Sequence, residues 1–260
     1  MRIAYAGIFL RVGAFVVTMF IWWAIAASNV LGSLAITSPQ DTFSSLYLLL
    51  ANGTLVSPFE RTFSEFFIAL IASLTLGSLG GLLMGVSERL DRVFDPYLSV
   101  MLVVPISAVL PVITVIFGLL TIVPAAVFAF LIAVFPIMAI VRTGVKNLNP
   151  NLLVVARIMG ISSDQLLLYV YLRATIRTIF SALRIGSILV MAGVLIEELY
   201  VQQPDNPGVG YLIAVFSSNF EVGNLYAVIF LLAMITIFIN DSLFYVEHKY
   251  PFVRRIRSTT

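Results

Sequence analysis

The amino-acid sequence predicts an all-α integral membrane protein with six transmembrane helices. Of its 260 residues, 60% are hydrophobic and 11% are charged, and the mean hydropathy is +1.06. A soluble globular domain usually carries about 25% charged residues, so this chain cannot cover a water-facing surface of its size. Long runs without charge set the number of the spans. The connections between them alternate in their content of Lys and Arg, and this alternation sets the direction of the spans.

The same composition excludes several other classes of protein. A disordered chain would be poor in apolar residues, and a disulfide scaffold or a thiolate zinc site would need cysteine, of which there is none. A single histidine, His248, leaves little for a histidine-rich metal site, and a net charge of +2 is too small to indicate nucleic-acid binding. We therefore expect no metal, no bound cofactor and no nucleic-acid partner for this chain.

Six stretches are long and apolar enough to cross a bilayer, which takes about 20 residues. The uncharged run at 96–141 has 46 residues, too many for one helix and suited to two. Its natural break is at 118–124, which begins with Gly and ends with Pro. The expected spans are about 8–30, 66–87, 97–119, 123–141, 176–200 and 225–246.

Lys and Arg fall almost entirely in alternate connections, which sets the orientation. Thirteen of the 15 lie before the first span or after the second, fourth and sixth. Arg61 is on the opposite side, and Arg184 lies inside the fifth span. Both termini are therefore expected in the cytoplasm. The first span could instead be a signal peptide cleaved near 24–26, but the apolar run continues past that point and the charge alternation needs the span.

Ionisable residues inside spans are costly and are the first functional candidates. Arg184 could face a bundle interior or a water-filled path, or its side chain could extend to the cytoplasmic interface. Glu197 and Glu198 end the same span on the outer side, where a pair of acids is typical of a solvated helix end. Glu65 and Asp241, near other span ends, are interpreted in the same way. No nucleophile has a partner base, so no catalytic residue is expected.

Glycines recur every four residues in the second expected span, at Gly77, Gly81 and Gly85. This spacing puts them on one helix face, where a neighbouring helix can approach closely. We interpret the stripe as packing within the chain.

Prolines lie inside the third and fourth expected spans, at Pro105, Pro111 and Pro136. Each removes a backbone donor and bends its helix. In a transporter such bends can line a cavity.

The connection between the fourth and fifth spans has more than thirty residues and is too long for a tight turn. A turn at 147–151 precedes an apolar stretch with helical spacing at about 152–161, which Gly160 ends. An apolar helix on the cytoplasmic face needs something to cover it. It could pack on its own bundle or bind a partner protein.

This connection resembles the cytoplasmic loop of permease subunits in binding-protein-dependent ABC importers, most closely the nitrate, sulfonate and taurine branch. The family motif is Glu-Ala-Ala, three residues, Gly, nine residues, Ile, any residue, Leu-Pro. Here Ala156, Gly160 and Leu172 match, Val170 is a close substitute, and Val154 and Arg173 replace the family's Glu and Pro. The segments at 77–81, 95–96, 182–186 and 198–213 resemble the family as well.

The resemblance implies the type I ABC importer permease fold. Residues 1–61 would form an N-terminal transmembrane helix and an outer loop, 62–255 the permease core, and 256–260 a cytoplasmic tail. It implies a multi-pass protein of the bacterial inner membrane that works by alternating access. Its partners would be two copies of a cytoplasmic ATPase that binds ATP and Mg, a second permease subunit, and a periplasmic or lipid-anchored solute-binding protein. A homodimer is favoured over a heterodimer.

The resemblance also assigns residues to roles. The helix that docks on the ATPase would comprise Val154, Val155, Ala156, Arg157, Ile158, Met159, Gly160 and Ile161. The translocation pathway would pass Pro105, Ser107, Pro111, Arg184 and Ser187. The outer gate or outer loop would contain Glu197, Glu198, Gly208 and Gly210.

Two other functions remain open from the residues alone. An ion-coupled secondary transporter would be expected to hold ionisable groups at the bilayer midplane and to show repeated halves, and neither is evident. A structural subunit would not need the apolar cytoplasmic helix. The solute cannot be identified from the sequence, although the resemblance suggests a small anion or an organic precursor.

Overall fold

The computed structural model describes residues 2–28, 36–118, 121–162 and 165–249, and the regular structure in these residues is entirely helical. The expected tail at 256–260 lies outside this part. The helices before the midpoint are α1 (Arg2–Ser28), α2 (Pro39–Ala51), α3 (Val56–Val86), α4 (Glu88–Val103), the 3₁₀ helix η1 (Ile106–Val109) and α5 (Leu110–Phe117). Those that follow are α6 (Val123–Lys146), α7 (Pro150–Ile158), the π-helix η2 (Leu166–Tyr171), α9 (Leu172–Tyr200), α10 (Val209–Ser218) and α11 (Val222–Lys249).

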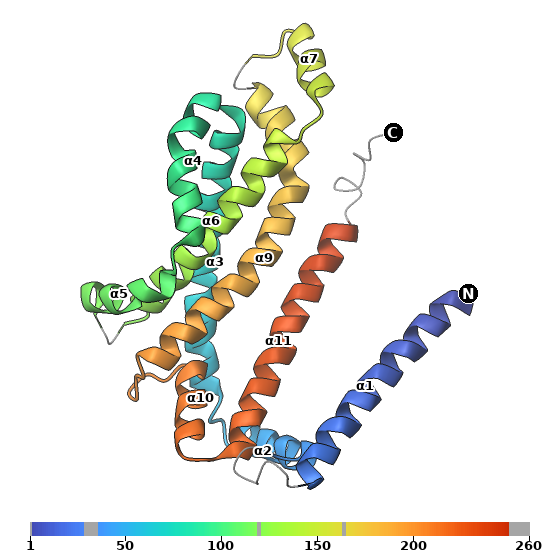
Figure 1. Cartoon of the computed structure of the whole chain (residues 1–260), viewed down its shortest axis with the longest axis vertical. Coiled ribbons are helices and arrows are strands. Elements are labelled where there is room, and N and C mark those ends of the chain that lie inside the picture. The colour runs from blue at the N-terminus through green and yellow to red at the C-terminus, as the bar shows by residue number, and fades with distance from the viewer. Residues whose placement is uncertain (1, 29–35, 119–120, 163–164, 250–260) are drawn as a thin grey trace.

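The centre of the bundle is α6, which packs against α3 on one side and α9 on the other (Figure 1). Apolar side chains from these helices, such as Phe66, Ile137 and Val190, are fully buried between them. Helix α11 packs against α9, α10 and α2, while α1 contacts α2 and lies beyond α11 in the view of Figure 1.

The glycine stripe of α3 faces α6. A β-carbon at Gly77 would lie 2.7 Å from a side-chain carbon of Ile137, and one at Gly81 would lie 2.5 Å from the carbonyl oxygen of Met138. At Gly85 it would lie 2.4 Å from the β-carbon of Val145. The absence of side chains at these positions is what lets the two helices approach so closely.

Four helical segments are long and apolar enough to cross a membrane: α3, α6, η2 with α9, and α11. The segment α4 with η1 and α5 is a fifth candidate, bent by 85°. Together with α1, this arrangement is consistent with the six expected spans.

Two expected spans differ from the structure. Helix α3 begins at Val56 and not near 66, because the charges of Arg61 and Glu65 pair one turn apart and do not end the helix. The single helix expected at 97–119 is wrong. Its first part, 97–103, belongs to α4, which starts at Glu88, and the chain breaks before Pro105, which cannot donate to the helix.

Candidate functional site

Helix α7 projects at one end of the molecule, the same end as the turn between α3 and α4, and far from α2 and α10 (Figure 1). It begins at Pro150 and ends at Ile158, slightly earlier than the expected 152–161. Gly160 follows with a φ of +74°, the left-handed conformation that glycine adopts readily after a helix.

The exposed side of α7 is apolar. Val154 and Val155 are just over half exposed, Ile158 is 80% exposed and Met159 is 74% exposed. Ala156 is buried and Ile161 is half-buried, so they attach the segment to the bundle. The side chain of Arg157 lies outside the described part of the structure. We call Val154, Val155, Ile158 and Met159 the docking patch.

A cluster of charges lies at the end of α6, shortly before α7 in the chain. Helix α6 ends at Lys146, four residues before α7 begins. On α6, Arg142 pairs with Asp91 and Asp95 of α4, with nitrogen–oxygen distances of 2.5 Å in both pairs, and Lys146 also pairs with Asp91. These ion pairs link α4 to the end of α6, from which a short connection leads into α7.

This charge cluster was not predicted from the sequence. A signal was present, because the acids on α4 and the bases on α6 are each four residues apart and so share a helix face. What the sequence did not show is that these two faces meet.

The residues expected in the pathway are not gathered in one place. Pro105, Ser107 and Pro111 lie in or beside the break between α4 and α5. A cavity of about 270 Å³ opens beside this break. It is lined by Met101, Leu102, Val104, Ile106 and Ser107, and by Ile132 and Pro136 of α6.

Arg184 lies on a different side of the bundle, toward α11. Its guanidinium is 3.7 Å from a carboxylate oxygen of Glu247 and 5.3 Å from the ring centre of Phe244. Ser187 is buried, and its hydroxyl donates to the carbonyl of Arg184 at 2.8 Å. The lining of the cavity beside Ser107 contains no residue of α9. The pathway role of Arg184 and Ser187 stays a prediction.

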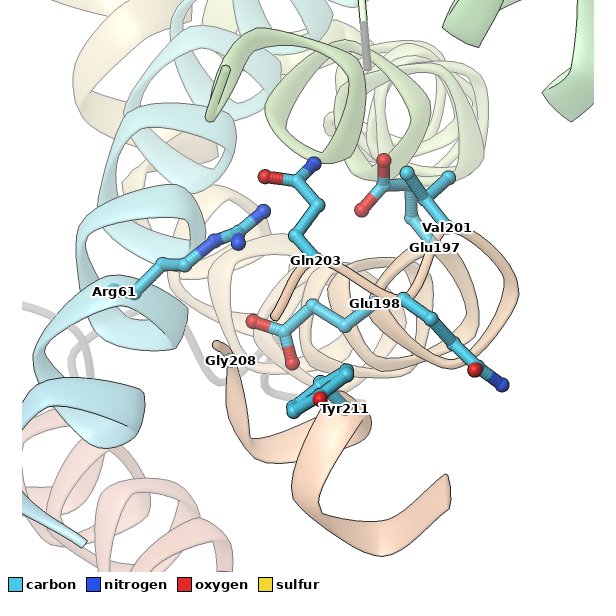
Figure 2. A pocket seen from close by; sticks show the side chains of 8 residues that line it. Arg61, Glu197, Glu198, Val201, Gln203, Gly208 and Tyr211 are labelled. Atoms are coloured by element: carbon cyan, nitrogen blue, oxygen red, sulfur yellow. The ribbon is translucent and has the colours of Figure 1, made fainter. Parts of the chain in front are cut away.

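A buried polar network joins α3, α9 and α10 at the opposite end from α7 (Figures 1 and 2). Thr62 donates to Glu198 at 2.6 Å, and the amide of Val209 donates to Thr62 at 2.9 Å. The other carboxylate oxygen of Glu198 accepts from the amide of Gly210 at 2.7 Å. Gly208 lies against the same carboxylate, where a β-carbon would collide with it. Glu198 therefore fixes the start of α10.

The rest of the network surrounds Arg61, which is 6% exposed. Its guanidinium donates to Glu65 at 2.8 Å and to the backbone carbonyl of Asn206. Glu197 is fully buried nearby, and neither of its carboxylate oxygens has a hydrogen-bond partner among the described residues. Figure 2 shows Arg61, Glu197 and Glu198 around the same small pocket.

The interpretation of Glu65, Glu197 and Glu198 as solvated helix ends is wrong, because all three are buried. Glu65 is paired with Arg61 one turn away, whereas Glu198 accepts from Thr62 of α3 and from the amide of Gly210 of α10. The contacts of Glu198 join distant segments, which helix-end patterns do not show. Within the described residues, no set of three His, Asp or Glu side chains is placed to hold a metal ion.

Comparison with known proteins agrees with this architecture. A family model described as binding-protein-dependent transport system inner membrane component matches residues 73–247, more than half of the chain. The chain is 26% identical over 187 residues to the taurine transport system permease protein of Escherichia coli, covering 68% of this chain and 66% of that protein.

Two further relatives extend the similarity. A probable ABC transporter permease protein of Haemophilus influenzae is 26% identical over 90% of this chain and 93% of its own length. The bicarbonate transport system permease protein of Synechococcus elongatus is 26% identical over 86% of this chain and 83% of its own length. With a family match over most of its helical bundle, the chain belongs to the inner membrane components of binding-protein-dependent transport systems and is an ABC transporter permease.

Proposed function

We propose that this chain forms the solute pathway of an ABC importer as a dimer, with two identical copies favoured over two different ones. In this proposal two cytoplasmic ATPase subunits bind ATP and Mg, and a periplasmic or lipid-anchored binding protein delivers the solute. The observation that carries the proposal is the docking patch, an exposed apolar surface on a short helix that the bundle leaves uncovered.

The end of the molecule that carries α7 is the one we assign to the cytoplasm. The Lys and Arg residues of the connections on that side outnumber those of the other side, as the positive-inside rule requires. Both termini would then be cytoplasmic. The buried network of Arg61 and Glu198 would lie at the outer end, where an outer gate or outer loop is expected.

The proposed mechanism is alternating access. Closure of the ATPases on ATP would move α7, and the charge cluster around Asp91 would carry that motion from α6 to α4. Two bundles would rock between inward-facing and outward-facing states, and hydrolysis would reset them. The chain itself would contribute no catalytic residue and no cofactor.

The solute is proposed to be small and polar, as taurine and bicarbonate are in the names of two relatives. Arg184 is already paired with Glu247 in this structure. We therefore do not assign it to the recognition of an anion.

The test is a substitution in the docking patch, Ile158→Asp. A carboxylate at this position would have to be desolvated in an apolar partner groove, which is costly. We expect co-purification of the co-expressed ABC ATPase to fall by about tenfold or more, which corresponds to about 1.4 kcal/mol of binding free energy or more. Solute uptake should fall in parallel.

A matched control is Tyr47→Ser, which changes another exposed apolar side chain, at the other end of the molecule on α2. This variant should retain the ATPase. Retention of the ATPase by Ile158→Asp at the level of the control would reject the docking role of α7.

A further inference from the structure

Glu197, near the end of α9, is a fully buried carboxyl group without a hydrogen-bond partner. Its exposed fraction is 0%, and among the described residues neither of its carboxylate oxygens accepts a hydrogen bond. The side-chain amide nitrogen of Gln203 is also buried and donates no hydrogen bond within the same residues. Both side chains line the small pocket of Figure 2. Because an isolated ionised carboxylate is very costly to bury, the charge of Glu197 needs compensation.

The charges around Glu197 do not supply this compensation. Arg61 is the base of the network, and its guanidinium already donates to Glu65 at 2.8 Å and to the backbone carbonyl of Asn206. Glu198, the next residue in the chain, adds a further acid. If all three acids were ionised, this buried network would hold three negative charges and one positive charge.

The hydrogen bonds indicate which of the three acids is left without compensation. Glu198 accepts a hydroxyl hydrogen bond from α3 and an amide hydrogen bond from α10, and donors of this kind stabilise an ionised carboxylate. Glu65 pairs with Arg61, and it also lies against Glu198. Glu197 has no such donor, although the charges of Arg61 and Glu198 act on it. The excess charge therefore belongs to Glu197.

Neither the other helices around α9 nor a second copy of the chain can compensate this charge. Tyr211 of α10 is the remaining titratable side chain in the pocket lining. Helices α6 and α11 also pack against α9, but their charged residues lie toward the end of the molecule that carries α7: Arg142, Lys146, Asp241, Glu247 and Lys249. A side chain that is fully buried within one copy stays buried when two copies associate, so a partner copy does not reach Glu197.

The size of the pocket decides which ligand can compensate Glu197. The pocket has no room for a water molecule. Within the described residues, no set of three His, Asp or Glu side chains is placed to hold a metal ion. A proton needs neither room nor a coordination shell. We infer that Glu197 is a proton-binding site, which is protonated in this structure and releases its proton when the outer end of the bundle opens to water.

The consequence for transport rests on the proposed alternating access. This structure holds one proton more than a state in which Glu197 is ionised in water. A rise in pH therefore favours the open state, by up to about tenfold per pH unit for one proton. Glu197 lies three residues before the end of α9 at Tyr200, so the pH that matters is the external one.

Infrared spectroscopy of the full-length protein tests the inference, because a protonated carboxyl group has a carbonyl stretch that an ionised carboxylate lacks. At about pH 7, where an exposed glutamate is ionised, we expect Glu197→Gln to lose one such band. The matched control is Glu60→Gln, which removes an exposed acid at the same end of the molecule and should leave the band unchanged. Glu197→Met removes the same proton and serves as a second variant in case Glu197→Gln fails to fold.

Thermal unfolding gives a second measurement. Because the folded protein holds the additional proton, Tm of the wild-type protein should fall between about pH 6 and about pH 8, and it should fall less in Glu197→Gln. Other groups that titrate in this range are common to both proteins.

Two results would overturn the inference. The first is that neither Glu197→Gln nor Glu197→Met loses a carbonyl band. The second is that sodium stabilises the wild-type protein but not Glu197→Gln, because a metal cation would then occupy the site. The infrared band does not depend on the ATPase, whereas Ile158→Asp tests docking alone, so failure of this inference and failure of the proposed function are distinguishable.

Discussion

Replacing Arg61 by methionine is expected to destabilise the protein more than the replacement of any other single charged residue in the half of the molecule opposite α7. The guanidinium is buried and balances carboxylates that are buried with it, including Glu65 at 2.8 Å. Removing one partner of a buried ion pair costs about 3–5 kcal/mol, because the other charge is left without compensation. Arg61 also holds the carbonyl of Asn206, so the connection between α9 and α10 should loosen. Thermal unfolding in detergent, followed by size-exclusion chromatography, measures the loss of stability.

Two further variants make this prediction specific. Arg89→Met removes an exposed arginine on α4 and should change the unfolding free energy by about 0.5 kcal/mol or less. Arg61→Met combined with Glu65→Leu removes both partners and should recover much of the loss, as apolar replacement of a whole buried pair often does. If Arg61→Met unfolds at the temperature of Arg89→Met, the network does not stabilise the outer end.

Local patterns predicted those parts of the structure that depend on near neighbours in the chain. The glycine spacing on α3, the exposed apolar helix near 150–158 and the alternating charges all follow from periodicity or from composition. The long α3 is an instructive exception. Its charges at Arg61 and Glu65 suggested the end of a span, but a pair one turn apart lowers the cost of burying both.

The predictions that were wrong concern residues whose contacts join distant segments of the chain. Glu198 is buried because Thr62, which lies 136 residues earlier, and the amide of Gly210 hydrogen-bond to it. Arg184 is oriented by Glu247 of α11. No spacing rule connects such residues, so the sequence showed that these charges were unusual without showing their partners.

The second large effect is expected from Gly81→Leu, where α3 lies close to the backbone of α6. A β-carbon there would lie 2.5 Å from the backbone oxygen of Met138 and 2.9 Å from the β-carbon of Val141. Because the nearest atom is backbone, no rotamer change relieves the collision, and the helices must separate. Overpacking of this kind costs typically 1–3 kcal/mol and occasionally more. For a domain of this size, each kcal/mol lowers Tm by about 2–4 °C.

We expect Gly81→Leu to weaken ATPase binding at the docking patch as well. A β-carbon at Gly81 would also lie 3.0 Å from the backbone nitrogen of Arg142, whose side chain pairs with Asp91. Separating α3 from α6 therefore disturbs the residue that links the end of α6 to α4, just before α7 in the chain, and retention of the ATPase should fall together with Tm. Gly13→Leu is the control, since a β-carbon at Gly13 meets nothing within 4 Å. Equal Tm and equal ATPase retention for the two variants would contradict the tight α3–α6 contact and the connection from it to α7.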